Sequence, residues 1–304
     1  MRRYLILVML AVGCESSTPP THVTTVPHTT TSAPRSPETE PFSWERYRGF
    51  SAFALAGKSA PEITATWSQA RAAGFNTARV CSETENWGDD EWHPRVARDP
   101  SSVERLLSTT AEVTGAQLLL MLDCTMKHSV DDAEGEAWTA TVLEIVERGR
   151  YLNVALEVVN EWWHPFYFVS RASLERRLDL ARRSGLQYGT DDHFCGGDRP
   201  LRHEFLGSVS FASFHPCRTD ELGAPWDPGR LLLERLVGEN GGLAILSETV
   251  AYDDSGQDCT GLFTCDRERI ERYMARCETT AGCRFTFHSR AGLRATGYSW
   301  FPGR

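Results

Sequence analysis

From Trp44 onward, short apolar runs alternate with longer polar and apolar segments. The short runs are rich in β-branched and aromatic residues, which favours buried strands, and the longer segments have the period of amphipathic helices. This alternation predicts repeated βα units that build a parallel sheet. The eight predicted strands are Gly49–Leu55, Thr77–Cys81, Gln117–Cys124, Asn153–Asn160, Gln187–Thr190, Val209–His215, Leu243–Glu248 and Arg284–His288.

Six segments between these strands have helical period. They are Ala60–Ala73, Ser101–Thr114, Trp138–Arg148, Ser173–Ser184, Pro228–Glu239 and Asp266–Glu278. About 260 residues with eight such units match the usual size of a (β/α)₈ TIM barrel, the fold class that we predict. A doubly wound open sheet is the alternative, although no glycine-rich phosphate loop follows the first strand.

The N-terminal residues have the pattern of an export signal. Arg2 and Arg3 precede an apolar run from Tyr4 to Val12, which predicts a signal peptide over residues 1–13. The run Leu10-Ala11-Val12-Gly13-Cys14 resembles a bacterial lipobox, with Ala11 where Leu is usual. The resemblance implies that Cys14 is lipidated and anchors the exported protein to a bacterial membrane, on the periplasmic or the cell-surface side. The alternative is an ordinary thiol in a cleaved signal.

Residues 14–42 are dominated by Ser, Thr and Pro and contain almost no large apolar residue before Phe42. Such a segment cannot bury enough surface to fold, so we expect a disordered tether. The barrel domain is then 43–304. No later stretch is long and apolar enough to span a membrane.

Charge and cysteine content narrow the class of protein. The net charge of -9 comes with no basic run, which argues against a nucleic-acid partner and favours an uncharged substrate. Eight cysteines follow Cys14, and an even number in an exported chain suggests disulfides. Zinc is the rival interpretation, but no paired CxxC or HExxH spacing is present. The sequence leaves the pairing open. Close spacing suits Cys259 with Cys265 and Cys277 with Cys283, and Cys81 with Cys124 would join neighbouring strand ends.

The active site of such a barrel forms at the carboxyl ends of its strands. Glu161 and Glu248 each directly follow an apolar run, on the fourth and the seventh predicted strand. A carboxylate at the end of a buried strand is costly unless it is compensated, and function is the usual compensation. Two carboxylates across a barrel mouth are what glycoside hydrolysis requires, one protonated and one ionised.

Two strand ends carry a resemblance to a family. Glu157-Val158-Val159-Asn160-Glu161 resembles the fourth strand of glycoside hydrolase clan A, which includes the family 5 cellulases and mannanases, and Ile245-Leu246-Ser247-Glu248 fits its seventh. The resemblance implies a retaining hydrolase of β-linked poly- or oligosaccharides that needs no cofactor or metal. Glu161 would be the general acid/base and Glu248 the nucleophile of a double displacement.

The resemblance also implies substrate-binding residues. Asn160 would donate to the sugar 2-hydroxyl, and Arg79 on the second strand would keep Glu248 ionised. Trp87 and Trp162, near strand ends, are candidate sugar platforms.

Three further candidates come with departures from the clan. His215 matches a strand-six histidine, but Cys217 stands where the clan has Tyr. Asp123 ends strand three, with Thr125 in place of a frequent His. His288 lies on strand eight where a Trp is common.

Structural roles compete with these assignments. Arg79 and Glu157 could form a buried ion pair, Asp123 could cap a loop, and the two histidines could be satisfied in the core. The departures also support an alternative function, a glycan-binding pseudoenzyme on the same barrel. A metal-dependent hydrolase is disfavoured because the first strand has no His-x-His pair. Its candidate ligands would be Asp123, Asp191, His215 and His288.

Overall fold

The computed structural model describes residues 39–85, 95–124, 132–162, 169–194, 202–216, 229–247, 251–252 and 267–289. The chain divides into two units, Met1–Arg35 and Ser36–Arg304, and all described residues belong to the second. Several predictions therefore fall outside the described residues. They concern the signal and lipid attachment at Cys14, most of the tether, Trp87, Glu248, and the cysteines Cys195, Cys217, Cys259 and Cys265.

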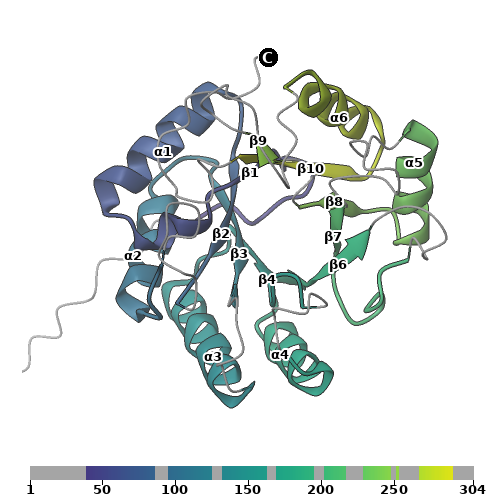
Figure 1. Ribbon diagram of the computed structural model, residues 1–304. Helices are drawn as coiled ribbons and strands as arrows, with labels where there is room; N and C mark the ends of the chain where they lie inside the picture. Colours follow the sequence, from purple (N-terminus) through teal and green to yellow (C-terminus); the bar gives the residue numbers. More distant parts are fainter. Residues whose placement is uncertain are drawn as a thin grey trace, which may run out of the picture. The chain divides into compact units, whose positions relative to one another are not determined.

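The second unit is a barrel of parallel strands surrounded by helices (Figure 1). Its strands are β1 (Gly49–Ser51), β2 (Thr77–Cys81), β3 (Gln117–Met121), β4 (Val154–Glu157), β5 (Gln187–Gly189), β6 (Asp191–Phe194), β7 (Ala212–Pro216), β8 (Ala244–Leu246), β9 (Ala251–Tyr252) and β10 (Cys283–Ser289). They follow the order β5-β4-β3-β2-β1-β10-β8-β7-β6, and β9 pairs with the end of β10.

The sheet closes because its two ends are neighbours in the sequence. Only Thr190 separates β5 from β6, and β5 pairs with β4 whereas β6 pairs with β7. The segment 187–194 therefore acts as one barrel strand that changes partner at Thr190. Counted in this way the barrel has eight strands, and the predicted (β/α)₈ fold is confirmed.

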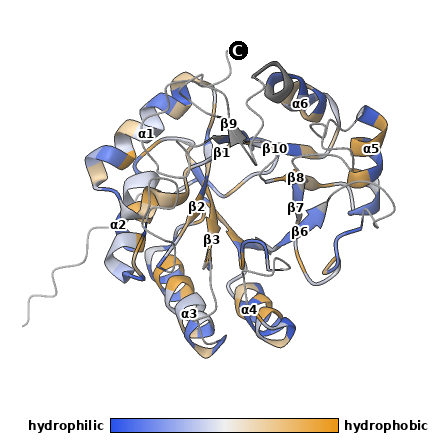
Figure 2. Ribbon diagram, in the orientation of Figure 1, coloured by the Kyte–Doolittle hydropathy of each residue, from blue (hydrophilic) through white to orange (hydrophobic). Residues whose placement is uncertain are grey.

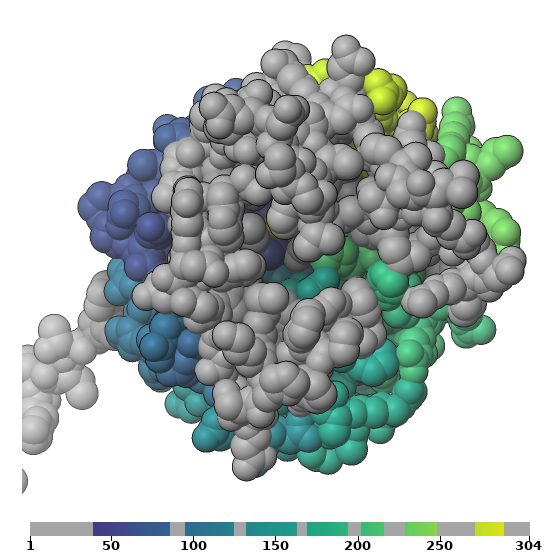
Figure 3. Space-filling model, in the orientation of Figure 1, coloured from purple at the N-terminus to yellow at the C-terminus, as the bar shows by residue number. Residues whose placement is uncertain are grey.

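The part of the chain that the structure describes has six α-helices, which follow one another around the outside of the barrel in chain order (Figure 1). They are α1 (Ala60–Ala72), α2 (Pro100–Ala111), α3 (Asp132–Gly149), α4 (Arg171–Arg183), α5 (Arg230–Glu239) and α6 (Arg267–Thr279). The colours around the rim of Figure 3 run in the same order, from purple through green to yellow. None of these described helices is long and apolar enough to cross a membrane.

Three helices begin earlier than the sequence pattern predicts, α2 by one residue, α4 by two and α3 by six. The Asp99 carboxylate accepts from the backbone N–H groups of Ser101 and Ser102 and so caps α2. The Ser170 hydroxyl caps α4 by accepting from the N–H of Ser173. In α2 and α4 the capping residue directly precedes the first helical residue.

The first predicted strand is too long. Only Gly49–Ser51 is extended, and Phe53–Gly57 forms a short 3₁₀ helix, η1. Phe53 to Ala56 are all buried, so this run has no polar side from which a period could be read. A continuous apolar run is compatible with either structure, which explains the error.

Apolar residues fill the space between the sheet and the helices. In Figure 2, β2 and β3 are largely apolar, whereas the helices alternate between apolar and polar residues along their length. A smaller cluster of Tyr47, Leu119, Ala155, Phe211 and Ile245 closes the barrel interior near the amino ends of the strands, with Phe42 and Trp44 packed against it. Above this cluster the interior becomes polar and positions the candidate site.

Two disulfides lie among the described residues. Cys81 and Cys124 join the ends of β2 and β3, with a Cα–Cα distance of 5.9 Å. Cys277 and Cys283 join α6 to β10 across six residues. Both pairs had been among those considered from the sequence, and the structure confirms them.

Candidate active site

The candidate site lies at the carboxyl ends of the strands, where Asn160 and Glu161 follow β4. Backbone hydrogen bonds extend the ladder beyond the strand, from Val158 N–H to Gly189 O and from Asn160 N–H to Asp123 O. The segment leading to Glu161 is therefore held from both neighbouring strands, and Glu161 starts from a fixed backbone position.

Glu161 adopts an unusual backbone conformation with φ of 48°. This left-handed region favours glycine and costs another residue about 1–2 kcal/mol. Strain of this kind persists only where the surroundings impose it, and it concentrates at functional sites. The side chain is 15% exposed, so its carboxyl group is largely enclosed but still reaches solvent.

The Glu161 carboxyl group contacts a histidine from β7, which is separated from β4 only by the strand 187–194. Its Oε1 lies 2.5 Å from Nδ1 of His215 on β7, and the His215 side chain is 6% exposed. The structure thus brings together two of the residues predicted from the sequence.

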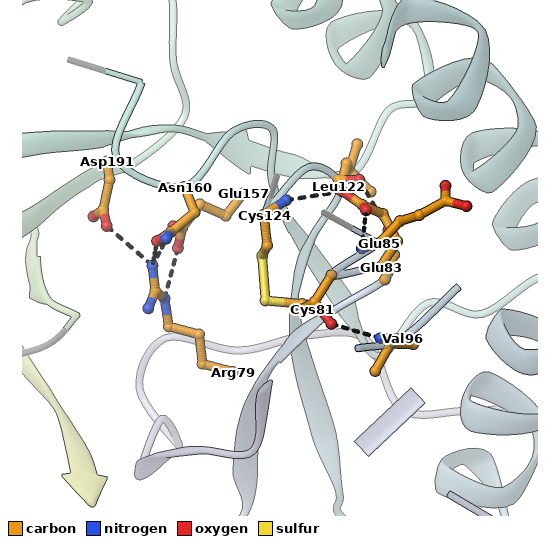
Figure 4. Close-up of a disulfide and its surroundings, with 12 residues drawn as sticks. Arg79, Cys81, Glu83, Glu85, Val96, Leu122, Cys124, Glu157, Asn160 and Asp191 are labelled. Carbon is orange, nitrogen blue, oxygen red and sulfur yellow. Dashed lines mark hydrogen bonds and ion pairs between the residues drawn. A yellow bond between two sulfur atoms is a disulfide. The ribbon is translucent and has the colours of Figure 1, made fainter. Parts of the chain in front are cut away.

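Arg79 is fully buried, and its guanidinium points toward Glu157, Asn160 and Asp191 (Figure 4). Its Nε donates to Glu157 Oε2 at 3.0 Å and its Nη2 to Glu157 Oε1 at 2.5 Å, so the buried ion pair considered from the sequence is present. Nη2 also donates to Asn160 Oδ1 at 2.7 Å. Because a guanidinium only donates, this bond fixes the Asn160 amide with its oxygen toward Arg79 and its nitrogen directed elsewhere.

Asp191 is a functional candidate that the sequence reasoning considered only as a metal ligand. It is fully buried, and its Oδ2 accepts from Arg79 Nη2 at 3.0 Å. The hydroxyls of Ser213 and Ser247 also donate to it. The sequence did contain a signal for Asp191 as a site residue, because it directly follows the predicted strand Gln187–Thr190. The same kind of position singled out Glu161.

Asp123 and His288 are buried and have protein partners. The Asp123 carboxylate forms an ion pair with the Arg177 guanidinium of α4, and both side chains are nearly inaccessible. Gly135 in α3 leaves room for that guanidinium, since a Cβ there would lie 2.1 Å from Arg177 Nη2. His288 Nδ1 lies 2.8 Å from the Ser51 hydroxyl. The contact of His288 matches the structural role weighed for it, whereas Asp123 pairs with a helix arginine that the sequence did not suggest as its partner.

The Cys81–Cys124 disulfide lies beside this interior network (Figure 4). Its sulfur-bearing residues pack with Phe53 and Met121, and all four are buried. Glu83 reinforces the same junction, because its Oε1 accepts from Cys124 N–H at 3.2 Å. The ends of β2 and β3 are therefore joined by a covalent bond and a buried carboxylate.

Trp162 follows Glu161 and packs partly against the core. Its ring meets Phe205 edge to face, with ring centroids 5.2 Å apart. Trp162 was predicted to stack against a sugar ring, and in the structure part of its ring is covered by protein. Trp87 and Glu248 lie outside the described residues, although Ser247, the residue before Glu248, ends β8 within the network.

The arrangement of donors does not favour the metal-dependent hydrolase. Among the described residues, no group of three or more His, Cys, Asp or Glu side chains could hold a metal ion. The four ligands considered from the sequence point to different partners. Asp123 pairs with Arg177, Asp191 with Arg79, His215 with Glu161, and His288 with Ser51.

A (β/α)₈ barrel with a glutamate held at the end of its fourth strand defines the class of structure with which the chain can be compared. Searches of protein-family models and of curated proteins each found no match. Solved structures do match. One is a Bacteroides vulgatus protein provisionally classed as a glycoside hydrolase, with TM-score 0.60, 12% identity, and coverage of 84% of this chain and 54% of that one.

Two mannanases are also similar in structure. The endo-1,4-β-mannanase of Rhizomucor miehei matches with TM-score 0.55 and 11% identity over 83% of this chain and 93% of its own. The endo-β-1,4-mannanase of Thermotoga petrophila matches with TM-score 0.53 and 13% identity over 82% and 68%. The present chain spans about half the length of the Bacteroides protein. At these identities the likeness shows a shared (β/α)₈ barrel fold.

Proposed function

We propose that this protein is a retaining glycoside hydrolase that cleaves O-glycosidic bonds in a β-linked poly- or oligosaccharide. The observation that carries the proposal is the position of Glu161. It ends the fourth barrel strand in a strained conformation, largely enclosed, with its carboxyl group on His215. The names of the structurally similar proteins give independent support for a carbohydrate substrate.

In the first step Glu161 acts as general acid. It transfers its proton to the glycosidic oxygen while a carboxylate oxygen of Glu248 attacks the anomeric carbon, so the glycosidic bond breaks and a glycosyl ester forms. In the second step the Glu161 carboxylate takes a proton from water. The resulting hydroxide oxygen bonds to the anomeric carbon and Glu248 leaves, which restores both residues and retains the anomeric configuration.

The neighbouring residues have separate tasks in this scheme. His215 holds the Glu161 carboxyl group in place in both steps. Arg79 orients Asn160 by binding its amide oxygen, which leaves the amide nitrogen to donate to the sugar 2-hydroxyl. Glu248 comes directly after Ser247, so the chain reaches the nucleophile position from the end of β8.

A glycan-binding pseudoenzyme is the second candidate. The observation in its favour is that Asp123 and His288, on strands where the clan places substrate-binding groups, are buried on protein partners. Such a protein would bind glycans without turnover, whereas the hydrolase would release reducing sugar.

The first test is a screen of the purified protein against β-linked polysaccharides and aryl β-glycosides. The hydrolase proposal predicts turnover of at least one of them and a loss of about 100- to 10,000-fold in Glu161→Gln, the usual contribution of general acid–base catalysis. Glu175→Gln is the matched control, since Glu175 pairs with Arg171 on the outer surface of α4. Glycan binding without turnover would instead support the pseudoenzyme.

We also propose that the protein is exported and held at a bacterial membrane by a lipid on Cys14, with residues 14–42 as its tether. The buried Cys81–Cys124 disulfide supports an oxidising compartment. Labelling of cells with a radioactive fatty acid should mark the parent and not Cys14→Ala. Equal labelling of both would refute the anchor without affecting the hydrolase proposal.

A further inference from the structure

The Asp191 carboxylate on β6 accepts hydrogen bonds from three side chains that come from other parts of the barrel. Its Oδ1 accepts from the Ser213 hydroxyl on β7 at 2.6 Å and from the Ser247 hydroxyl at the end of β8 at 2.9 Å. Its Oδ2 accepts from Arg79 on β2 at 3.0 Å. All four side chains are fully buried. This carboxylate therefore links strands that lie on different sides of the barrel.

Two of these contacts lead directly to proposed catalytic groups. Ser247 is the residue before Glu248, and its backbone N–H donates to Phe214 O at 2.9 Å. Asp191 thus fixes the residue from which the chain enters the nucleophile position. Through Arg79 it reaches Asn160, the residue before Glu161.

The charges make this junction rigid. Arg79 donates to two buried carboxylates, at 2.5 Å to Glu157 Oε1 and at 3.0 Å to Asp191 Oδ2. Charge-assisted hydrogen bonds are about twice as strong as neutral ones, and a buried network loses much if one member moves. A displacement of Asp191 would therefore be passed to Arg79 and to Ser247 together.

We propose that Asp191 is a positioning residue that aligns the two proposed catalytic glutamates from beneath, Glu248 through Ser247 and Glu161 through Arg79 and Asn160. The proposal rests on the proposed hydrolase function. It differs from a purely structural role in one respect. Of the two serine hydroxyls that donate to Asp191 Oδ1, only that of Ser247 should matter for the reaction.

The test uses a rate that does not depend on how much of the sample is folded. A 2-deoxy-2-fluoro aryl glycoside of a sugar that the parent hydrolyses traps the nucleophile as a stable ester, and each folded molecule reacts with a first-order rate constant. Asp191→Asn should lower this rate constant about 100-fold, the effect of a displacement of about 1 Å, with inhibitor binding within about twofold of the parent. A structural defect alone would lower the fraction that reacts, not the rate constant.

Two serine variants form a matched pair that keeps the proposal testable if Asp191→Asn folds poorly. Ser247→Ala and Ser213→Ala each remove one buried hydroxyl that donates to Asp191 Oδ1. Ser247→Ala should slow trapping about tenfold, the effect of one hydrogen bond to a charged group. Ser213→Ala should slow it less than about threefold, because Ser213 does not adjoin a proposed catalytic residue.

The outcomes separate the two proposals. If the parent turns over no glycoside, the hydrolase function fails and the role of Asp191 fails with it. If the parent is active but Asp191→Asn is trapped at the parent rate, or the two serine variants slow trapping equally, only the positioning role is overturned.

Discussion

Glu161 Oε1 lies 2.5 Å from Nδ1 of His215, a contact that joins the residue after β4 to β7. Both side chains are largely enclosed, so bulk water has little access to the contact. The contact ties the proposed general acid to a group that can hold it in place throughout a two-step reaction.

This contact predicts the effect of removing the imidazole. His215→Ala should lower kcat/KM about 10- to 100-fold, less than a Glu161 variant, because the acid remains but is no longer held. The loss should appear in kcat measured with substrates of poor leaving group, which depend most on proton donation. An unchanged kcat for such substrates would show that His215 has no role in the reaction.

The buried charges predict a large effect on stability. Arg79→Met leaves Glu157 and Asp191 buried without their shared cation, and breaking a buried ion pair in this way costs about 3–5 kcal/mol. Urea unfolding measures the change, and adding Glu157→Gln should recover part of it. The control is Arg182→Met, whose exposed pair with Asp179 should contribute less than about 1 kcal/mol. Equal losses in the two single variants would contradict the arrangement in Figure 4.

The two described disulfides should contribute unequally. Cys81–Cys124 spans 43 residues and Cys277–Cys283 spans six. Loop-closure entropy then predicts losses of about 4 and about 2 kcal/mol when each pair is replaced by alanine. Unfolding free energies of the two double variants test the order. A larger loss for the shorter loop would show that native-state contacts outweigh the entropy of the unfolded chain.

Asp99 predicts a pH dependence at one helix end. Hydrogen bonds from the Ser102 and Ser101 hydroxyls and backbone lower its pKa to about 2. Since the folded pKa lies below the unfolded value near 3.9, the cap stabilises the protein fully above about pH 4 and loses this contribution as the pH falls through about 2. An NMR titration of the carboxyl carbon should give the low pKa. Asp99→Asn should still cap the helix but lack the pH-dependent part of the stability. In the parent, a pKa of the Asp99 carboxyl group near 3.8 would refute the cap.

Strand and helix alternation was sufficient to predict the barrel. Thr77–Cys81 was predicted with its observed bounds, because polar and glycine residues delimit a short β-branched run on both sides. The run after Ser51 was assigned wrongly, since every residue from Phe53 to Ala56 is buried and period carries no information there. The break at Thr190 was also missed, because it depends on the barrel closing and not on local sequence.

The candidate site was predictable only in part. Glu161 could be identified because it follows an apolar strand directly. The role of Asp191 could not, since its importance comes from Ser213, Ser247 and Arg79, which are far apart in the sequence. Arg177 was overlooked for a related reason, because an arginine on an Arg-rich helix resembles a surface residue until Gly135 of the neighbouring helix is seen to make room for it.

The central claim is that Glu161 is the general acid/base of a retaining hydrolase, and kinetics of Glu161→Ala with azide test it most directly. The account predicts a loss of about 100- to 10,000-fold on substrates with poor leaving groups and little loss in the first step with dinitrophenyl glycosides. Azide, which needs no general base, should restore turnover and give a glycosyl azide with the anomeric configuration of the substrate. Parent-like hydrolysis by Glu161→Ala, or a glycosyl azide of inverted configuration, would contradict the assignment.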